Sequence, residues 1–185
     1  MRTLAVTQNI TLDGSIELLD GWFSPPTDVD AADDLLEESR RQDSASDALL
    51  LGRRTFEDFR SYWPLQHDDP TGIADYLDRV DKYVVSSTLI EPGWDNTTVL
   101  DGDPVEQVAA LKERPGLDIV ATGSISLCHS LIEAGLVDEF RMFVYPAVQG
   151  RGRRLFPEGY SRAGLRLLES TAFSGDILFT RYAPP

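Results

Sequence analysis

Ala48-Leu49-Leu50-Leu51-Gly52-Arg53-Arg54-Thr55 is the stretch that sets the fold class of this chain. Four consecutive apolar residues ended by a glycine are typical of a short strand covered on both faces, as in a largely parallel sheet. The residues that follow, 53–59, have the pattern of a helix. The stretch therefore predicts a strand that passes directly into a helix, which is the repeating unit of α/β proteins.

The same alternation continues on both sides of this stretch. Further strands are predicted over 3–10, 82–86, 117–122 and 139–145, and helices over 28–42, from Pro104 behind an Asp103 cap, and over 124–134 with Gly135 as the stop. The segments 165–170 and 176–182 alternate apolar and polar residues around Ser174-Gly175, as in a hairpin. We expect one α/β domain over 1–185, with a mixed, mostly parallel sheet flanked by helices and a C-terminal antiparallel hairpin.

Bulk properties narrow the class of protein. A chain of 185 residues with 42% apolar content suits one buried core. A net charge of -14 argues against a nucleic-acid partner, and it is typical either of a solvated acidic surface or of adaptation to high salt. Because no run approaches the roughly 20 apolar residues of a membrane helix and no signal peptide is recognisable, we expect no membrane partner and a cytoplasmic location.

Side-chain redox or metal chemistry is not expected. The single cysteine, Cys128, excludes an intrachain disulfide, and the two histidines, His67 and His129, lie far apart in the sequence. A zinc deaminase would need a His-x-Glu motif with Cys-x-x-Cys, and neither motif occurs.

Small and polar residues follow three of the predicted strands, in the segments 51–55, 85–88 and 121–124. Open α/β sheets bind their ligands at this end of the strands. Glycine allows a close approach to the backbone, and a helix N-terminus attracts phosphate. In the simplest alternative, Ser124 is only a helix cap and Gly123 a tight turn. Arg53 is poorly placed for the helix dipole, which favours a phosphate-binding role for it.

Further motifs occur in a fixed order along nearly the whole chain. They are Thr11-Leu12-Asp13-Gly14, the 50–56 segment, Tyr62-Trp63-Pro64, Tyr83-Val84-Val85-Ser86, Thr122-Gly123-Ser124, and 135–139 running on to Pro146, Gly150, Gly152 and Leu155-Phe156. With these motifs the chain resembles the dihydrofolate-reductase-like superfamily. It is most similar to the branch that contains the reductase domain of the bifunctional riboflavin-biosynthesis deaminase-reductase.

The resemblance implies NADPH as the cofactor and assigns residues to it. Gly52, Arg53 and Thr55 would meet its phosphates, Ser86 and Ser87 would flank the adenosine 2′-phosphate, Gly123 and Ser124 with Thr122 beside them would cradle the pyrophosphate, and Asn9 would lie along the nicotinamide. An arginine and two serine hydroxyls suit a phosphate dianion, so we expect Arg53, Ser86 and Ser87 to favour NADPH over NADH.

The chain departs from the related enzymes at two places. They commonly carry a glycine pair where this chain has Thr122-Gly123, so the closest backbone approach is expected to differ. Dihydrofolate reductases carry a pterin-binding carboxylate on the first helix, which here has no clear match. The candidate substrate residues, each also explicable as a cap, a solvated face or core packing, are Asp13, Trp22, Asp34 and Trp63. No catalytic residue is assigned.

The function expected is hydride transfer from NADPH to a small heterocyclic (pteridine- or pyrimidine-like) or carbonyl substrate, in which the cofactor supplies the chemistry. The alternative is a non-catalytic nucleotide- or ligand-binding protein that retains the fold. The apolar strands 140–145 and 178–182 are expected to extend a sheet whose edge needs covering, which predicts a homodimer.

Overall fold

The computed structural model describes residues 1–19, 21–23 and 33–185. The strands are β1 (Leu4–Thr11), β2 (Ser46–Gly52), β3 (Asp81–Val85), β4 (Thr97–Leu100), β5 (Asp118–Ala121), β6 (Glu139–Tyr145), β7 (Arg166–Phe173) and β8 (Ile177–Ala183). The helices are α1 (Asp33–Ser44), α2 (Arg53–Tyr62), α3 (Ile73–Arg79), α4 (Pro104–Lys112) and α5 (Ile125–Glu133), with short 3-10 turns η1 (Trp63–Leu65) and η2 (Ser174–Asp176).

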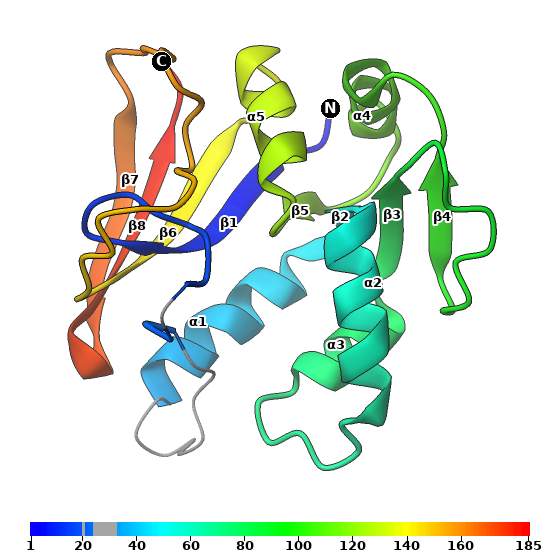
Figure 1. The fold of residues 1–185 in the computed structure, drawn as a ribbon, viewed down its shortest axis with the longest axis horizontal. Coiled ribbons are helices and arrows are strands. Elements are labelled where there is room, and N and C mark those ends of the chain that lie inside the picture. Colours follow the sequence, from blue (N-terminus) through cyan, green and yellow to red (C-terminus); the bar gives the residue numbers. More distant parts are fainter. Residues whose placement is uncertain (20, 24–32) are drawn as a thin grey trace.

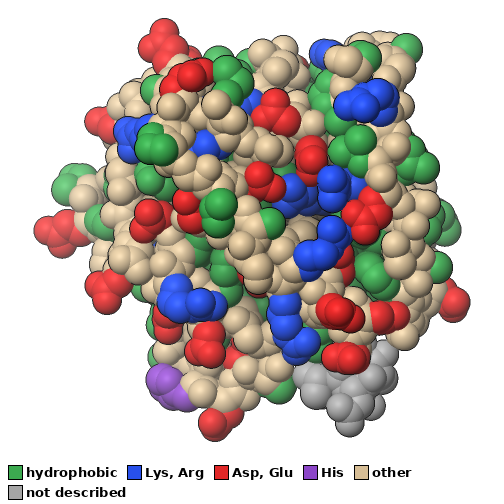
Figure 2. Space-filling model, turned by 180° about the vertical axis from the view of Figure 1, so that it is seen from behind, with side chains coloured by type: hydrophobic (Ala, Val, Ile, Leu, Met, Phe, Trp, Pro, Cys, Tyr) green, Lys and Arg blue, Asp and Glu red, His purple; other side chains and the backbone are tan. Residues whose placement is uncertain are grey.

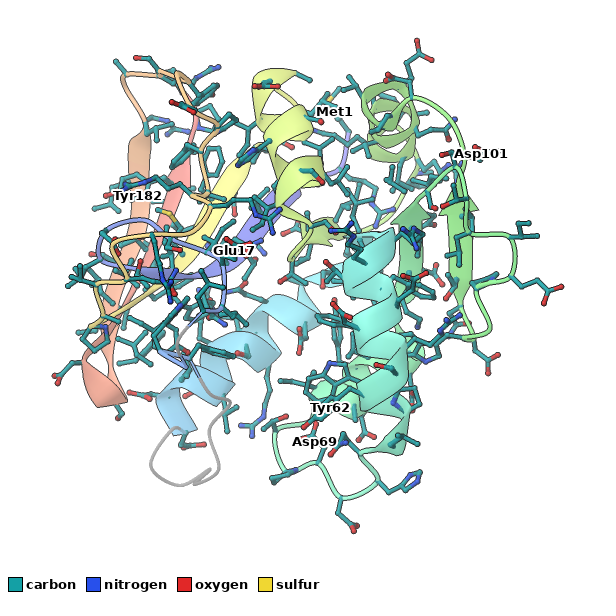
Figure 3. All side chains as sticks on the ribbon, viewed as in Figure 1. Met1, Glu17, Tyr62, Asp69, Asp101 and Tyr182 are labelled. Atoms are coloured by element: carbon teal, nitrogen blue, oxygen red, sulfur yellow. The ribbon has the colours of Figure 1, made fainter. Side chains whose placement is uncertain are left out.

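All these strands form one sheet in the order β4-β3-β2-β5-β1-β6-β8-β7. The strands from β4 to β6 are parallel, and β8 and β7 add an antiparallel hairpin beside β6. In Figure 3, Asp101 after β4 and Tyr182 on β8 lie toward opposite ends of this order. The predicted α/β fold with a mixed, mostly parallel sheet and a C-terminal antiparallel hairpin is confirmed.

Helices cover both faces of the sheet (Figure 1). On one face, residues of α4 and α5 such as Leu111 and Leu131 pack with Val6 and Leu50 in the largest core cluster. The other face holds two separate clusters, one beneath α2 and α3 and one beneath α1. The hydrophobic core on this face of the sheet is therefore divided into two parts.

The predicted element boundaries hold well where capping residues mark them. Asp103 accepts the backbone N–H groups of Val105 (2.9 Å) and Glu106 (3.0 Å), as expected of the cap before α4. Gly135 stops α5 with φ 68°, and Leu136 N–H closes the helix on the Leu131 carbonyl (3.0 Å). The predicted start of the first helix at Asp28 lies outside the described residues, and α1 ends at Ser44 rather than Gln42.

The apolar segments 140–145 and 178–182 extend the sheet as β6 and β8, as predicted, and both strands are interior. The strand at the edge beyond β8 is β7, which is mostly exposed and carries Leu167 and Leu168. No helix in the described part of the chain is long and apolar enough to cross a membrane.

Candidate functional site

The helices α2 and α5 begin side by side at the carboxyl ends of β2 and β5. The backbone N–H of Gly52 donates to Ser124 Oγ (2.6 Å), and the backbone N–H of Ser124 donates to Thr55 Oγ1 (2.9 Å). The two hydroxyl oxygens are themselves 3.0 Å apart. This reciprocal arrangement fixes the two helix N-termini relative to each other.

The local backbone explains why these residue types occupy the junction. Gly123 and Ser124 both have left-handed φ values, 65° and 53°. A Cβ on Gly123 would lie 2.7 Å from Thr55 Cγ2, and a Cβ on Gly52 would collide with the Ser124 side chain. The two residues with left-handed backbone are Gly123 and Ser124. This pair begins one residue after Thr122-Gly123, the position at which related enzymes commonly carry a glycine pair.

Ser124 occupies the N-cap position of α5, as the simplest sequence interpretation held, but its side chain makes no capping hydrogen bond to its own helix. Instead its hydroxyl crosses to α2. A non-glycine residue in the left-handed region costs about 1 kcal/mol or more. The three hydrogen bonds of Ser124 to the α2 junction offset that cost.

The paired N-termini form an anion-binding geometry. The first N–H groups of an α-helix have no partner within the helix, which applies here to residues 53–55 of α2 and 125–127 of α5. Both helices direct the positive ends of their dipoles to the same place. Two converging helix N-termini with a glycine at each junction suit a bound phosphate or pyrophosphate.

Two arginines lie in the first turn of α2, and only one of them is paired. Arg53 Nη1 donates to both carboxylate oxygens of Glu57 (3.1 Å each), one turn along the helix. Arg54 is exposed and makes no side-chain hydrogen bond or ion pair with any described residue. Sequence reasoning selected Arg53 for the phosphate and did not consider Arg54 for that role. The four-residue spacing of Arg53 and Glu57 was the available signal, because such pairs form readily on helices.

Ser86 and Ser87 follow β3, the strand next to β2. Ser86 is buried, and its Oγ accepts the N–H groups of Thr88 (3.2 Å) and Leu89 (3.0 Å), so that it shapes the turn. Ser87 is exposed at the same turn. Of the two hydroxyls, only that of Ser87 is open to a ligand without a change in the turn.

Asn9 and an aromatic group lie at the other end of the carboxyl edge. Asn9 is half-buried on β1, in register with Phe143 of β6, and its amide makes no hydrogen bond within the described chain. The rings of Trp22 and Phe23 meet that of Tyr145 edge-on, at centroid distances of 5.7 and 5.5 Å. Burial raises the pKa of Tyr145 to about 12, so its phenol stays protonated.

The two candidate tryptophans lie in different surroundings. Trp22 belongs to the aromatic group at the end of β6, and its Nε1 donates to the Glu17 carbonyl (3.2 Å). Trp63 follows α2 and meets Tyr62 edge-on at 5.1 Å, beside the cluster beneath α2 and α3. No ring contact joins Trp63 to Trp22 among the described residues, so these two side chains do not form one stacking surface for a substrate.

The carboxylates of Asp13 and Asp34 both hold backbone groups. Asp13 accepts the Thr11 hydroxyl (2.6 Å) and the N–H groups of Gln149 (3.1 Å) and Gly150 (2.8 Å). These bonds, that of Thr11 foremost, lower the pKa of Asp13 to about 2. The Ser174 N–H, donating to Asp34 at 2.7 Å, lowers the pKa of that carboxyl as well. Both groups are ionised at neutral pH.

The order of the strands arranges these groups in a line. Along β3-β2-β5-β1-β6 the carboxyl ends present in turn Ser86 and Ser87, the α2 N-terminus, the α5 N-terminus, Asn9, and the Trp22 group. Hydroxyls and backbone N–H groups therefore occupy one end of the line and aromatic rings the other. This separation suits an elongated ligand with phosphates at one end and a flat ring at the other.

Comparison with known proteins agrees with this geometry. Residues 2–179 match the family described as the RibD C-terminal domain. The chain belongs to this family. This chain is also similar to the uncharacterized protein YyaP of Bacillus subtilis (strain 168). The two are 32% identical over 183 residues, which are 96% of this chain and 92% of YyaP.

Solved structures support the same fold for this RibD C-terminal domain. A putative riboflavin biosynthesis protein from Shewanella sp. PV-4 superposes with a TM-score of 0.71 at 22% identity, covering 99% of both chains. Dihydrofolate reductase from Enterococcus faecalis, complexed with NADP(H), superposes with a TM-score of 0.64 at 16% identity, covering 98% of this chain and 96% of the reductase. At these identities the likeness establishes a dihydrofolate-reductase-like fold.

Proposed function

We propose that this RibD C-terminal domain is an NADPH-dependent reductase that passes a hydride to a small heterocyclic, pteridine- or pyrimidine-like substrate, or to a carbonyl substrate. The observation that carries the proposal is the junction of α2 and α5, where Gly52, Thr55 and Ser124 hold two helix N-termini together. NADP(H) in the related dihydrofolate reductase and the family assignment support the same cofactor here.

The donor groups at the carboxyl edge fit NADPH in chemistry and in order. The open N–H groups of 53–55 and 125–127, next to Gly52, Gly123 and Thr122, suit the pyrophosphate. The 2′-phosphate is a dianion and needs a local cation, because the chain as a whole is acidic. We assign that role to Arg54 with Ser87, since Arg53 would first have to leave Glu57 and the Ser86 side chain is buried in the turn.

The remaining residues would position the reacting groups. Bound NADPH would supply the hydride. The Asn9 amide, free of hydrogen bonds within the described chain, would hold the nicotinamide on β1, and the ring of Trp22 beside Tyr145 would exclude water and face a flat substrate. Asp13 and Asp34, ionised and bonded to backbone groups, would fix the surrounding loops, which leaves water as the proton source.

The same two carboxylates favour a second candidate function, a non-catalytic NADPH- or ligand-binding protein. A protein that only binds its ligand needs no proton donor, and the low pKa of Asp13 and of Asp34 removes both as donors near neutral pH. Steady oxidation of NADPH with a panel of pteridines, pyrimidines and quinones would establish the reductase. Tight NADPH binding without turnover on any of them would favour the binding protein.

Cofactor preference is the direct test of the site. We expect the protein to bind NADPH more tightly than NADH. In Arg54→Ala the NADPH affinity should fall by about 10- to 100-fold, because the variant loses one charge-assisted hydrogen bond to the 2′-phosphate. Binding of NADH should change far less. Titration of both cofactors against the wild type, Arg54→Ala, Arg53→Ala and Ser86→Ala/Ser87→Ala would measure this.

Each alternative result has a distinct meaning. If Arg53→Ala alone removes the preference, the cation is Arg53, as the sequence first indicated, and its pair with Glu57 opens on binding. An equal loss for both cofactors in Arg54→Ala would place Arg54 at the shared pyrophosphate. A wild type that binds neither cofactor would refute the reductase and the NADPH-binding protein alike.

We also propose that the domain works as a homodimer in the cytoplasm. The hairpin exposes Leu167, Leu168 and Leu178, by 54%, 38% and 43%, on and beside the edge strand β7, and a second copy would cover them. Light scattering should give the mass of a dimer at micromolar concentration. A Leu167→Lys/Leu178→Lys variant should be monomeric, and a wild type that is monomeric throughout would contradict the proposal.

A further inference from the structure

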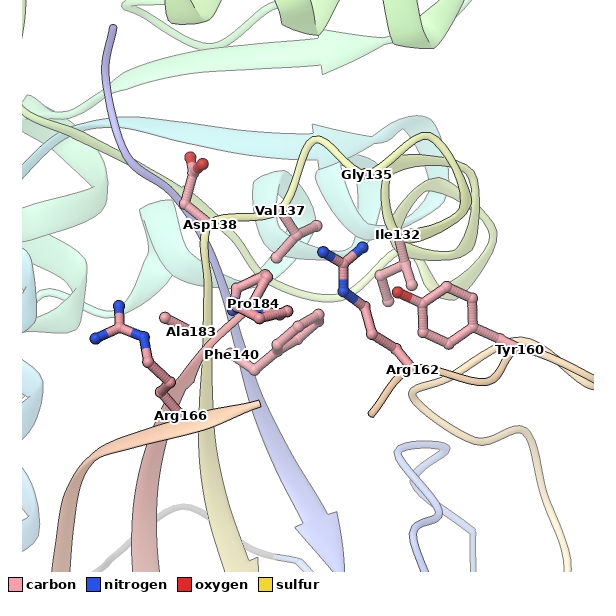
Figure 4. A pocket seen from close by; sticks show the side chains of 11 residues that line it. Ile132, Gly135, Val137, Asp138, Phe140, Tyr160, Arg162, Arg166, Ala183 and Pro184 are labelled. Carbon is pink, nitrogen blue, oxygen red and sulfur yellow. The ribbon is translucent and has the colours of Figure 1, made fainter. Parts of the chain in front are cut away.

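A cavity of about 380 Å³ lies at the amino edge of the sheet, the edge opposite to the α2 and α5 N-termini. The end of α5, the starts of β6 and β7 and the end of β8 surround it (Figure 4). Its buried apolar residues are Ile132, Val137, Phe140 and Ala183. Small-molecule pockets have volumes of roughly 300–1,000 Å³, so this one has room for a single ring system.

Two unpaired arginines line this cavity. In Figure 4, Arg166 lies on one side of Phe140 and Pro184, and Arg162 lies on the other side, next to Tyr160. Neither arginine makes a side-chain hydrogen bond or an ion pair with any residue that the structure describes. Figure 2, which shows the molecule from behind the view of Figure 1, has many basic side chains next to acidic ones. Two free guanidinium groups at one cavity are unusual in a chain of net charge -14.

The third polar group is the phenol of Tyr160. Its ring stacks on Phe156, with the ring centres 6.0 Å apart and the planes at 4°, and Phe156 packs in turn on Phe140 at 5.1 Å. The ring is therefore held in place by the core. Its hydroxyl makes no hydrogen bond within the described part of the chain, so it is available to a ligand.

The carboxylate of Asp138, which lines the cavity, already has partners. Asp138 Oδ2 accepts from Lys112 Nζ (2.5 Å) and from the Leu4 N–H (2.8 Å). At the end of α5, the carbonyls of Leu131 and Ile132 accept the N–H groups of the turn at Gly135. The positive charge of Arg162 and Arg166 is therefore not cancelled by their surroundings.

We propose that this cavity is a second ligand site, which binds a small organic anion. Its carboxylate or phosphate group pairs with Arg162 and Arg166, since guanidinium groups match both oxyanions. Its flat apolar body lies against Phe140 and Val137, with the Tyr160 hydroxyl at its rim. The site is independent of the proposed cofactor site, because no residue is common to the two.

The test uses the full chain and three simple ring compounds. Benzoate and phenyl phosphate carry the two oxyanions, and benzamide is the neutral counterpart. In calorimetric titrations we expect at least one oxyanion to bind about 10-fold or more tightly than benzamide, and Arg162→Ala/Arg166→Ala to weaken it by about 10- to 100-fold. Amide chemical shifts should move at Gly135 and Arg166.

The matched control is Arg114→Ala, which removes an exposed arginine that does not line the cavity and has no ionic partner among the described residues, and it should leave binding unchanged. Tyr160→Phe should cost only a few-fold, because the ring remains. The comparison of benzoate with phenyl phosphate identifies the oxyanion.

Three results would overturn the proposal. One is binding that the double variant does not weaken in a folded protein, and another is a set of shifts centred on Gly123 instead of Gly135. The third is inorganic phosphate binding as tightly as phenyl phosphate, because the apolar residues Phe140 and Val137 would then contribute nothing to the affinity. If the double variant instead converts a dimer into a monomer while no ring compound binds, the cavity is a contact between copies and not a ligand site.

Discussion

The two ends of the parallel strands are held together by different chemistry. At the amino edge, charged side chains pair segments that are not neighbours in the sheet, or lie on one strand or on a helix, as in Arg2–Asp47, Lys112–Asp138, Arg141–Asp118 and Arg141–Glu139. At the carboxyl edge, glycines, hydroxyls and backbone N–H groups form the contacts, as at Gly52, Thr55 and Ser124. Ionic groups thus hold chain segments together at one edge, while the other edge keeps helix N-termini open.

This difference separates stability from binding. An ion pair whose partners are both protein side chains is already satisfied, so the amino-edge pairs contribute to folding, and a ligand at this edge depends on Arg162 and Arg166, which have no ionic partner among the described residues. At the carboxyl edge the hydroxyls fix the backbone but leave the first-turn N–H groups of α2 and α5 open. Substitutions at the carboxyl edge should therefore change cofactor affinity, and substitutions at the amino edge should change the free energy of unfolding.

Gly123→Val should give the largest effect. Its Cβ would meet Thr55 Cγ2 at 2.7 Å, and φ is 65°, a backbone conformation that a β-branched residue avoids. The substitution forces the N-termini of α2 and α5 apart, so we expect NADPH affinity to fall by about 100-fold or more, as measured by titration.

Gly116→Val is the matched control at the amino edge. There a Cβ would meet Arg2 Cζ and Asp47 Oδ2, each at 2.8 Å, with φ at 152°. It should lower the free energy of unfolding and leave the NADPH affinity of the folded protein unchanged. Equal losses of NADPH affinity in the two valine variants would mean that the two edges do not have separate roles.

Asp138→Ala should have an intermediate effect, on stability alone. It removes the carboxylate that accepts from Lys112 Nζ (2.5 Å) and the Leu4 N–H (2.8 Å), while Lys112 itself stays buried. Because Asp138 is partly exposed, we expect the free energy of unfolding to fall by about 2 kcal/mol, less than for a fully buried pair. Urea denaturation would measure this, and Asp138→Asn, which keeps an acceptor for Leu4, should lose less.

Sequence patterns located the interior of the fold because the central strands are covered on both faces. Short apolar runs such as 48–51 and 83–85 are typical of such buried strands. The edge strand β4, Thr97–Leu100, was missed because it has no such run. The helix α3, Ile73–Arg79, was missed because seven residues show no clear period, and its N-cap Gly72 provides no side-chain cap.

The candidate site was predictable in position but not in detail. Glycines and hydroxyls at strand ends indicated the carboxyl edge, and the structure brings Gly52, Thr55, Gly123 and Ser124 together there. A strand pattern does not tell which side chain crosses to which helix, so the contact of the Ser124 hydroxyl with the Gly52 N–H could not be read from it. The loop bonds of Asp13 to 149 and 150 join residues far apart in the sequence and were equally hidden.

Asp43→Asn should have the smallest effect, and it tests the amino edge through pH. Asp43 lies just before β2, where burial raises its pKa from 3.8 to about 6, and the nearby charge of Arg79 opposes this only in part. The folded protein thus binds the proton more tightly than the unfolded chain, so this carboxyl contributes stability that is complete below about pH 4 and lost as the pH rises through about 6.

Since asparagine resembles the protonated carboxyl, Asp43→Asn should match the wild type near pH 4 and exceed its free energy of unfolding by about 1–2 kcal/mol at pH 8, a figure reduced for partial solvent exposure. Urea denaturation of both proteins at pH 4, 6 and 8 would measure the difference, with the exposed Asp68→Asn as control. A gap that is the same at every pH would show that Asp43 does not titrate in this range. Affinity for NADPH should be the same in both proteins, because Asp43 lies at the edge that binds no cofactor in our proposal.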